Sequence, residues 1–79
     1  MPNIERLMEK LGCARGLVPL REIEQVLRAH LYLLERISGS HFHYEGPGGR
    51  FVSFPTHNNK VKACYVKAII KKIGNYEKN

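Results

Sequence analysis

Residues 41–55, HFHYEGPGGRFVSFP, form the stretch that decides the fold. Within residues 41–45 apolar and polar side chains alternate, a period of two that is typical of a strand with one buried face. The glycine- and proline-rich residues 46–49 predict a turn, and residues 50–54 predict a second strand that Pro55 ends. Together they predict a β-hairpin with its aromatic rings on one face and two histidines on the other.

Helical periodicity precedes this hairpin. Residues 4–11 carry apolar side chains at helical spacing behind Asn3, which is a good capping residue. A second helix is expected to begin near Pro19, because proline suits the first turn of a helix. The periodicity alone leaves open whether this helix runs to Arg36 or ends near Leu31.

After the hairpin, residues 60–62 predict a short edge strand, and residues 63–73 predict a last helix that Gly74 ends. The order of elements predicts a small α+β domain with its helices on one face of an antiparallel sheet.

Charge is distributed unevenly along the chain. Lys and Arg number 13 against 7 Asp and Glu, a net charge of +6, and no acidic residue lies between Gly46 and Tyr76. A basic half of a small domain attracts a polyanion, so the charge favours nucleic acid or an acidic protein as a partner. The same lysines also suit plain solubility, and the charge does not choose between these interpretations.

Length and composition exclude several classes of protein. A chain of 79 residues allows one domain, and it has no apolar run of the roughly 18 residues that a membrane-spanning helix needs. The N-terminus lacks the apolar core of a secretory signal. Cys13 and Cys64 lack metal-site or redox spacing, so we expect free thiols in a cytoplasmic protein.

Two histidines are the main candidates for chemistry. His41 and His43 are expected on the open face of the hairpin, where imidazoles that titrate near neutral pH can exchange protons with a phosphodiester. Inert surface histidines are the alternative. A metal site formed by His41, His43 and His57, with Glu45 as a further ligand, is a weaker hypothesis. Zinc sites have three or four ligands in recognisable spacing, and these residues lack it. His30 is expected at the edge of the core with a hydrogen-bonded ring nitrogen.

Three segments in order resemble the HicA family of small bacterial toxins. They are RISGSH at residues 36–41, FPTH at residues 54–57 and KVKACYVK at residues 60–67. In the register that places Tyr32 at the family's aromatic position, Leu31 stands where the family's first helix ends in glycine.

The resemblance implies a fold like the double-stranded RNA-binding domain, with a helix, three strands and a helix. It further implies an endoribonuclease that cleaves messenger RNA without a metal or other cofactor, and a HicB-like antitoxin as protein partner in a hetero-oligomer. Residues 19–79 are then the HicA-like domain, and residues 1–18 are an N-terminal helical extension.

The resemblance also implies site residues. His41 follows Gly-Ser and takes the catalytic role, with His43 as the candidate assisting residue. The uneven charge adds the expected RNA contacts, which are the basic side chains of Arg50, Lys60, Lys62, Lys67 and Lys71. A non-catalytic RNA-binding domain of the same fold is the alternative function, because a fold does not determine its chemistry.

Overall fold

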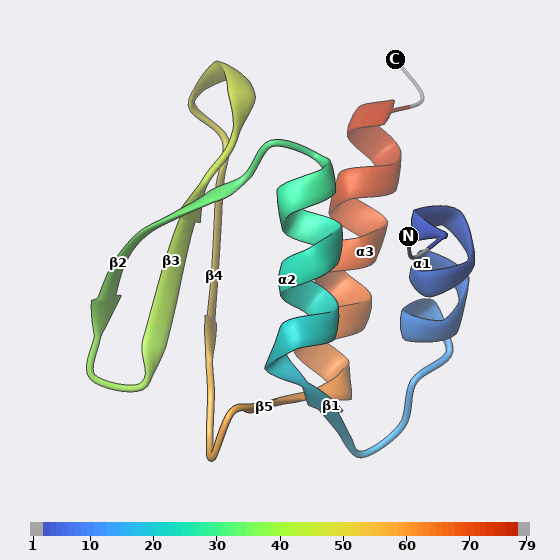
Figure 1. Cartoon of the computed structure of the whole chain (residues 1–79), viewed down its shortest axis with the longest axis horizontal. Helices are drawn as coiled ribbons and strands as arrows, with labels where there is room; N and C mark the ends of the chain where they lie inside the picture. Colours follow the sequence, from blue (N-terminus) through green and yellow to red (C-terminus); the bar gives the residue numbers. More distant parts are fainter. Residues whose placement is uncertain (1–2, 78–79) are drawn as a thin grey trace.

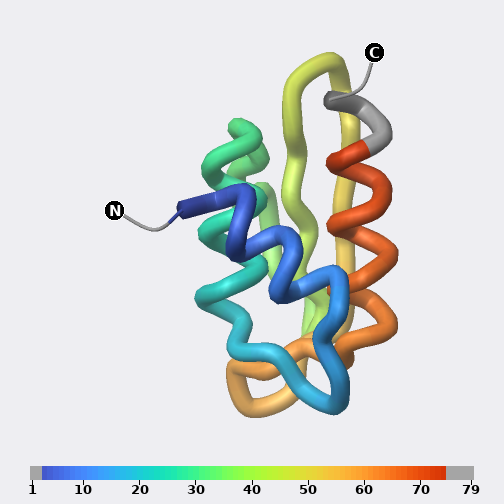
Figure 2. The backbone as a smooth tube through the Cα atoms, turned by 90° about the vertical axis from the view of Figure 1, so that its right-hand side faces the viewer, coloured from blue at the N-terminus to red at the C-terminus, as the bar shows by residue number. Residues whose placement is uncertain are grey.

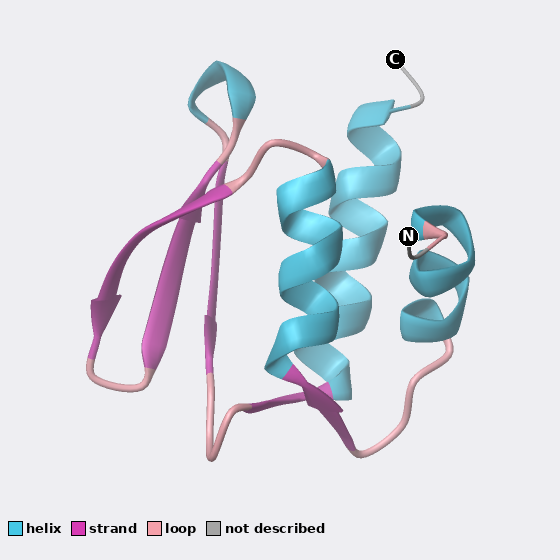
Figure 3. Ribbon diagram, viewed as in Figure 1, coloured by secondary structure: helices cyan, strands magenta, loops and turns pink. Residues whose placement is uncertain are grey.

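The computed structural model describes residues 3–77 of the chain. Figure 3 shows how its helices and strands follow one another. In chain order the elements are α1 (Ile4–Gly12), β1 (Leu17–Pro19), α2 (Leu20–Ala29), β2 (Leu33–Ser38), β3 (His41–Glu45), the short 3-10 turn η1 (Pro47–Gly49), β4 (Phe51–Pro55), β5 (Lys60–Lys62) and α3 (Ala63–Glu77).

The elements form three layers. The antiparallel sheet β2-β3-β4 is the first layer, and α2 and α3 cover one of its faces (Figure 1). The view turned by 90° shows α1 lying across α2 and α3 on the side away from the sheet (Figure 2). The pair α2 and α3 is therefore covered on two sides, whereas no helix among residues 3–77 lies over the second face of the sheet. This arrangement confirms the predicted α+β class and its helix–three strands–helix order.

The predicted hairpin is confirmed with its faces as expected. In the register of β3 and β4, Phe42 lies opposite Phe54, and Tyr44 lies opposite Val52. Tyr44, Val52 and Phe54 are buried, and the rings of Tyr44 and Phe54 stack with centroids 5.6 Å apart. The Tyr44 hydroxyl donates a 2.7 Å hydrogen bond to the Glu24 carboxylate on α2, so the inward face is joined to the helix layer by a polar contact as well.

The third strand of the sheet is β2. The short strand predicted at residues 60–62 is present as β5, but it does not join this sheet. The backbone amides of Leu31 and Tyr32 donate to the carbonyls of Arg28 and Leu27, at 3.0 and 2.8 Å. These two bonds form a Schellman motif, which ends a helix when the residue after its C-cap is left-handed. Leu31 has that conformation, with a φ of 66°, and β2 begins two residues later, at Leu33.

Residues 60–62 instead pair with β1 in a separate two-stranded sheet, so the residues just before the second helix form a strand that the sequence did not predict. A tight turn between β4 and β5 explains why β5 does not continue the sheet of β4. Asn58 and Asn59 both have positive φ, 53° and 61°, as the two central residues of a type I′ turn require. His57 and Lys60 exchange backbone hydrogen bonds across it, both 2.9 Å long. The chain thus turns away from β4 before β5 begins.

The last helix runs further than predicted. α3 continues through Gly74 to Glu77, since Gly74 does not adopt the left-handed conformation with which glycine ends helices. None of the helices in residues 3–77 combines the length and the apolar character needed to span a bilayer.

The N-terminal segment shares the core of the domain. The Asn3 side chain caps α1 by accepting a 3.1 Å hydrogen bond from the Arg6 amide, as predicted. Leu11 is buried in the core, and Leu7 and Met8 pack against it. His30, which directly follows the last residue of α2, is half-buried. Its Nδ1 lies 2.8 Å from the Val26 carbonyl oxygen, as expected for a residue at the edge of the core.

The left-handed Leu31 predicts an unusual stability effect. A left-handed conformation costs an L-residue about 1–2 kcal/mol, and glycine avoids that cost but loses more backbone entropy on folding. Leu31 is 70% exposed, so little packing is lost on its replacement. We expect Leu31→Gly to exceed Leu31→Ala in free energy of unfolding by about 0.5–1 kcal/mol, measured by urea denaturation. An alanine variant as stable as the glycine variant would contradict this expectation.

Candidate functional site

The open face of the sheet carries the two candidate histidines. His41 and His43 alternate with the inward-facing Phe42 and Tyr44, so both point away from the helices, as predicted. Their rings lie 6.5 Å apart between centroids at an interplanar angle of 26°. His41 is exposed and His43 is half-buried, so solvent and a large ligand can reach both from this side.

The register of the sheet adds a cation to this face. Arg36 on β2 lies directly opposite His43, and His43 in turn lies opposite Ser53 on β4. Opposed residues of an antiparallel sheet share a face, so the guanidinium of Arg36 belongs to the histidine side. The sequence reasoning did not select Arg36 as a site residue, although it is the first residue of the RISGSH segment.

A tight turn places His41 at the start of β3. Ser38 and His41 are paired, and Gly39 and Ser40 form the two-residue turn between them. Gly39 has a φ of 62° and Ser40 has no positive φ, a combination typical of a type II′ turn with glycine first. The glycine before Ser40 is thus the residue that the first central position of this turn favours.

Thr56 holds this turn against the end of β4. Its backbone amide donates to the Ser40 carbonyl at 2.8 Å, and its Oγ1 donates to the same oxygen at 3.2 Å. The Thr56 side chain is only 8% exposed, so this clamp is shielded from water. His41 is therefore attached to β4 through the residue before it. The sequence reasoning missed Thr56, and the available signal was its place inside the FPTH segment.

His57 and Lys60 lie at the same end of the molecule as the Gly39–Ser40 turn. His57 directly follows the Thr56 clamp, and the Asn58–Asn59 turn brings Lys60 next to His57 through the paired backbone hydrogen bonds. Both side chains are exposed, as is that of Lys62 on β5.

Other predicted RNA contacts lie further from His41. Arg50 follows the turn at the far end of the hairpin, because His41 pairs with Pro55 whereas Glu45 pairs with Phe51. Four residue steps along a strand span about 13 Å.

Lys67 and Lys71 are exposed on α3, in the helix layer. At about 100° per residue, they lie one turn apart on a side of α3 away from Lys72, whose Nζ donates a 2.7 Å hydrogen bond to the Phe51 carbonyl on β4. The structure thus leaves Arg50, Lys67 and Lys71 outside the group of histidines.

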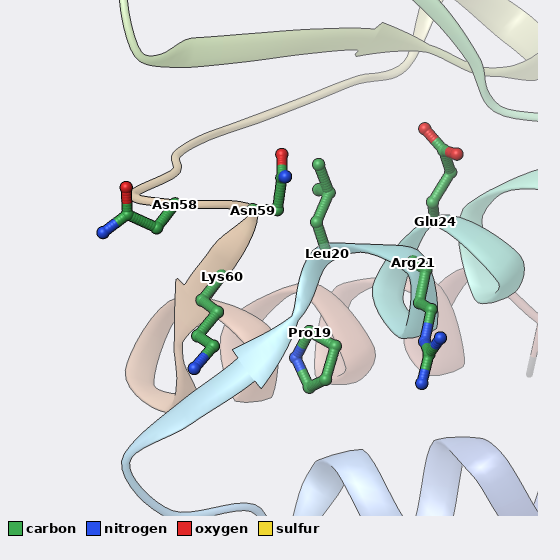
Figure 4. Close-up of a pocket in the computed structure, with 7 residues that line it drawn as sticks. All are labelled: Pro19, Leu20, Arg21, Glu24, Asn58, Asn59 and Lys60. Atoms are coloured by element: carbon green, nitrogen blue, oxygen red, sulfur yellow. The ribbon is translucent and has the colours of Figure 1, made fainter.

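A hollow of about 430 Å³ lies between the first turn of α2 and the Asn58–Asn59 turn (Figure 4). Its wall carries charges of both signs, from Arg21, Lys60 and Glu24. Glu24 is also the acceptor of the Tyr44 hydroxyl, and burial together with this carboxylate raises the pKa of Tyr44 well above its usual value. Tyr44 therefore stays a neutral donor, and the Glu24 carboxylate serves as the acceptor of its hydroxyl.

The described residues give no metal-ligand cluster. Within residues 3–77, no three side chains of His, Cys, Asp or Glu gather closely enough to hold an ion. The thiols of Cys13 and Cys64 are both exposed and free, as predicted.

The fold and the site define a small α+β domain whose open sheet face carries histidines behind a Gly-Ser turn. A family model described as the HicA toxin of bacterial toxin–antitoxin systems matches residues 20–74, well over half of the chain. The chain therefore belongs to the HicA toxin family. Its matched region begins after α1, with the first residue of α2. Comparison with curated proteins and with solved structures gives no match.

The Thr56 clamp can be tested with two substitutions. Thr56→Val removes the hydroxyl donor, and Thr56→Ser keeps the donor but removes a buried methyl group, so each should lower the free energy of unfolding by about 1 kcal/mol. Only Thr56→Val should also shift the backbone amide NMR resonances of residues 38–41. Equal shifts in both variants would show that the hydroxyl does not hold the turn.

Proposed function

We propose that this chain is a toxin endoribonuclease that cleaves messenger RNA in the cytoplasm with His41 as general acid or base. The observation that carries the proposal is the placement of His41, which is exposed on the open sheet face and fixed by the Gly39–Ser40 turn and the Thr56 clamp. Membership of the HicA toxin family implies ribonuclease activity in general, and the geometry supports His41 as the residue that performs it.

The chemistry that suits this face is an internal transfer of the phosphoryl group. One imidazole removes the proton of a 2′-hydroxyl as that oxygen bonds to the adjacent phosphorus. A protonated imidazole donates to the 5′-oxygen as its bond to phosphorus breaks. His43, with its ring 6.5 Å from that of His41, is near enough to assist at the same phosphate. The Arg36 guanidinium stabilises the charge on the phosphoryl oxygens, and the reaction needs no metal.

Binding of the RNA backbone uses exposed cations on the sheet and on α3. Lys60 and Lys62 lie at the end where the Thr56 clamp and His57 are found, and they are suited to phosphates next to the cleaved bond. Arg50, Lys67 and Lys71 contact phosphates further along the strand. Such contacts make the affinity fall as salt concentration rises.

The same geometry supports restraint of the toxin by an antitoxin. A HicB-like antitoxin with acidic side chains that covers the open face blocks His41 and His43 at once. The alternative function, RNA binding without cleavage, is supported by the position of Lys67 and Lys71 away from the histidines.

The catalytic assignment predicts the outcome of one substitution. His41→Ala should reduce the rate of RNA cleavage by about 10²–10⁴-fold, because a positioned general acid or base contributes that much. His57→Ala, which removes another exposed histidine at the same end, is the matched control and should reduce the rate less than tenfold. Both variants are assayed on labelled RNA with and without a chelator, and their folding is checked by circular dichroism.

Three results would contradict the proposal. Cleavage that survives His41→Ala would remove His41 from the chemistry. Cleavage that stops with the chelator would indicate a metal-dependent reaction. A wild-type chain that binds RNA with steep salt dependence but leaves it intact would establish the RNA-binding alternative.

A further inference from the structure

The outer edge of β2 is the feature of the fold that the site does not use. β2 pairs with β3 on one side, and no strand within residues 3–77 pairs with its other side. All six of its residues are exposed, including three large apolar ones: Leu33 at 67%, Leu34 at 42% and Ile37 at 53%. An exposed strand edge with apolar side chains is a template for pairing with another strand.

A bulge changes how the side chains of β2 are presented. Leu34 lies opposite Tyr44 and Arg36 lies opposite His43, so Glu35 is an extra residue between the two pairs. Leu34 and Ile37, which are three positions apart, therefore share the helix side of the sheet. In a regular strand they would face opposite sides.

The sequence of β2, LLERIS, is complementary to itself when read in the opposite direction. About a twofold axis between Glu35 and Arg36, Glu35 meets Arg36 of the second copy, and Leu34 meets Ile37 of the second copy. The remaining pairs join Leu33 to Ser38, which lie opposite Glu45 and His41 and so share the open face. The Leu34–Ile37 and Leu33–Ser38 pairs have matching faces, and the central Glu35–Arg36 pairs have opposite charges.

We propose that β2 pairs antiparallel with β2 of a second copy of this chain. The pairing joins two three-stranded sheets into one sheet of six strands, with both histidine faces on the same side. The contact is isologous, as in most symmetric dimers, since each copy supplies the same surface.

Charge complementarity favours a second copy over another partner. The chain carries a net charge of +6, which opposes association of two copies in general. Along this edge, however, Glu35 balances Arg36, and the nearby Glu45 is acidic. The β2 edge is thus a place where two basic chains can approach without repulsion.

The test exchanges the two central charges in a His41→Ala background. Under the proposed function, a chain without His41 does not harm the cells that express it. Sedimentation equilibrium should show a dimer for this parent chain. Glu35→Arg and Arg36→Glu should each raise its dissociation constant at least tenfold, because like charges then face each other across the axis. An equimolar mixture of the two variants should dimerise again. In the mixed dimer, two positive side chains at positions 35 and 36 of one copy face two negative side chains of the other. The double variant should also recover the dimer.

Charge changes elsewhere serve as controls. Glu9→Arg on α1 and Arg15→Glu before β1 alter the net charge equally at exposed positions and should leave the dissociation constant within about twofold of the parent. Circular dichroism of each variant shows whether it is folded.

Three outcomes would overturn the proposal. The first is a parent chain that stays monomeric up to millimolar concentration. The second is a dimer that neither single substitution weakens, which would place the contact on another surface. The third is a monomeric chain whose binding to a co-expressed antitoxin is weakened by the two substitutions, which would make the antitoxin the occupant of this edge.

Discussion

The packing of one sheet face on α2 and α3 is the constraint on which the site depends. Tyr44 and Phe54 are buried in the core and Phe42 packs against it, and burial of such large apolar side chains stabilises a domain of this size. Because side chains alternate along a strand, the same burial directs His41 and His43 outward. The outward direction of the two histidines thus follows from the packing of the core.

Contacts at the end of the sheet also fix the position of His41 along the strand. The Gly39–Ser40 turn sets where β3 begins, and the Thr56 clamp joins that turn to β4. A shift of β3 by one residue would move the aromatic rings to solvent and the histidines into the core, so the register is strongly specified. The sheet therefore acts as a rigid support for exposed groups that have to reach a large substrate.

Much of this arrangement could be predicted from the sequence. The hairpin and its two faces follow from strict alternation and a glycine-rich turn, both of which are local signals. The strand β2 could not be assigned, because its apolar residues continue the helical spacing of α2, and the stop signal is a leucine in a conformation that glycine usually takes.

Features that depend on distant contacts were also missed. The pairing of β5 with β1 joins segments about 40 residues apart, and periodicity carries no information on such a contact. Thr56 looks like an ordinary residue at a strand end until the structure brings it to Ser40. The continuation of α3 was missed for a different reason, because a glycine after an apolar helical pattern favours a stop, whereas Gly74 keeps a φ that is not positive.

The two edges of the sheet differ in a way that limits assembly. At the β4 edge, α3 lies alongside, and the Lys72 ammonium already occupies the Phe51 carbonyl. A strand arriving there meets a filled acceptor and a positive charge, whereas the edge of β2 is open. Edge-to-edge growth of this sheet is therefore favoured at the β2 edge and opposed at the β4 edge. Two copies that meet at their open edges present closed edges outward, and the assembly stops at a discrete particle before it can become a fibre.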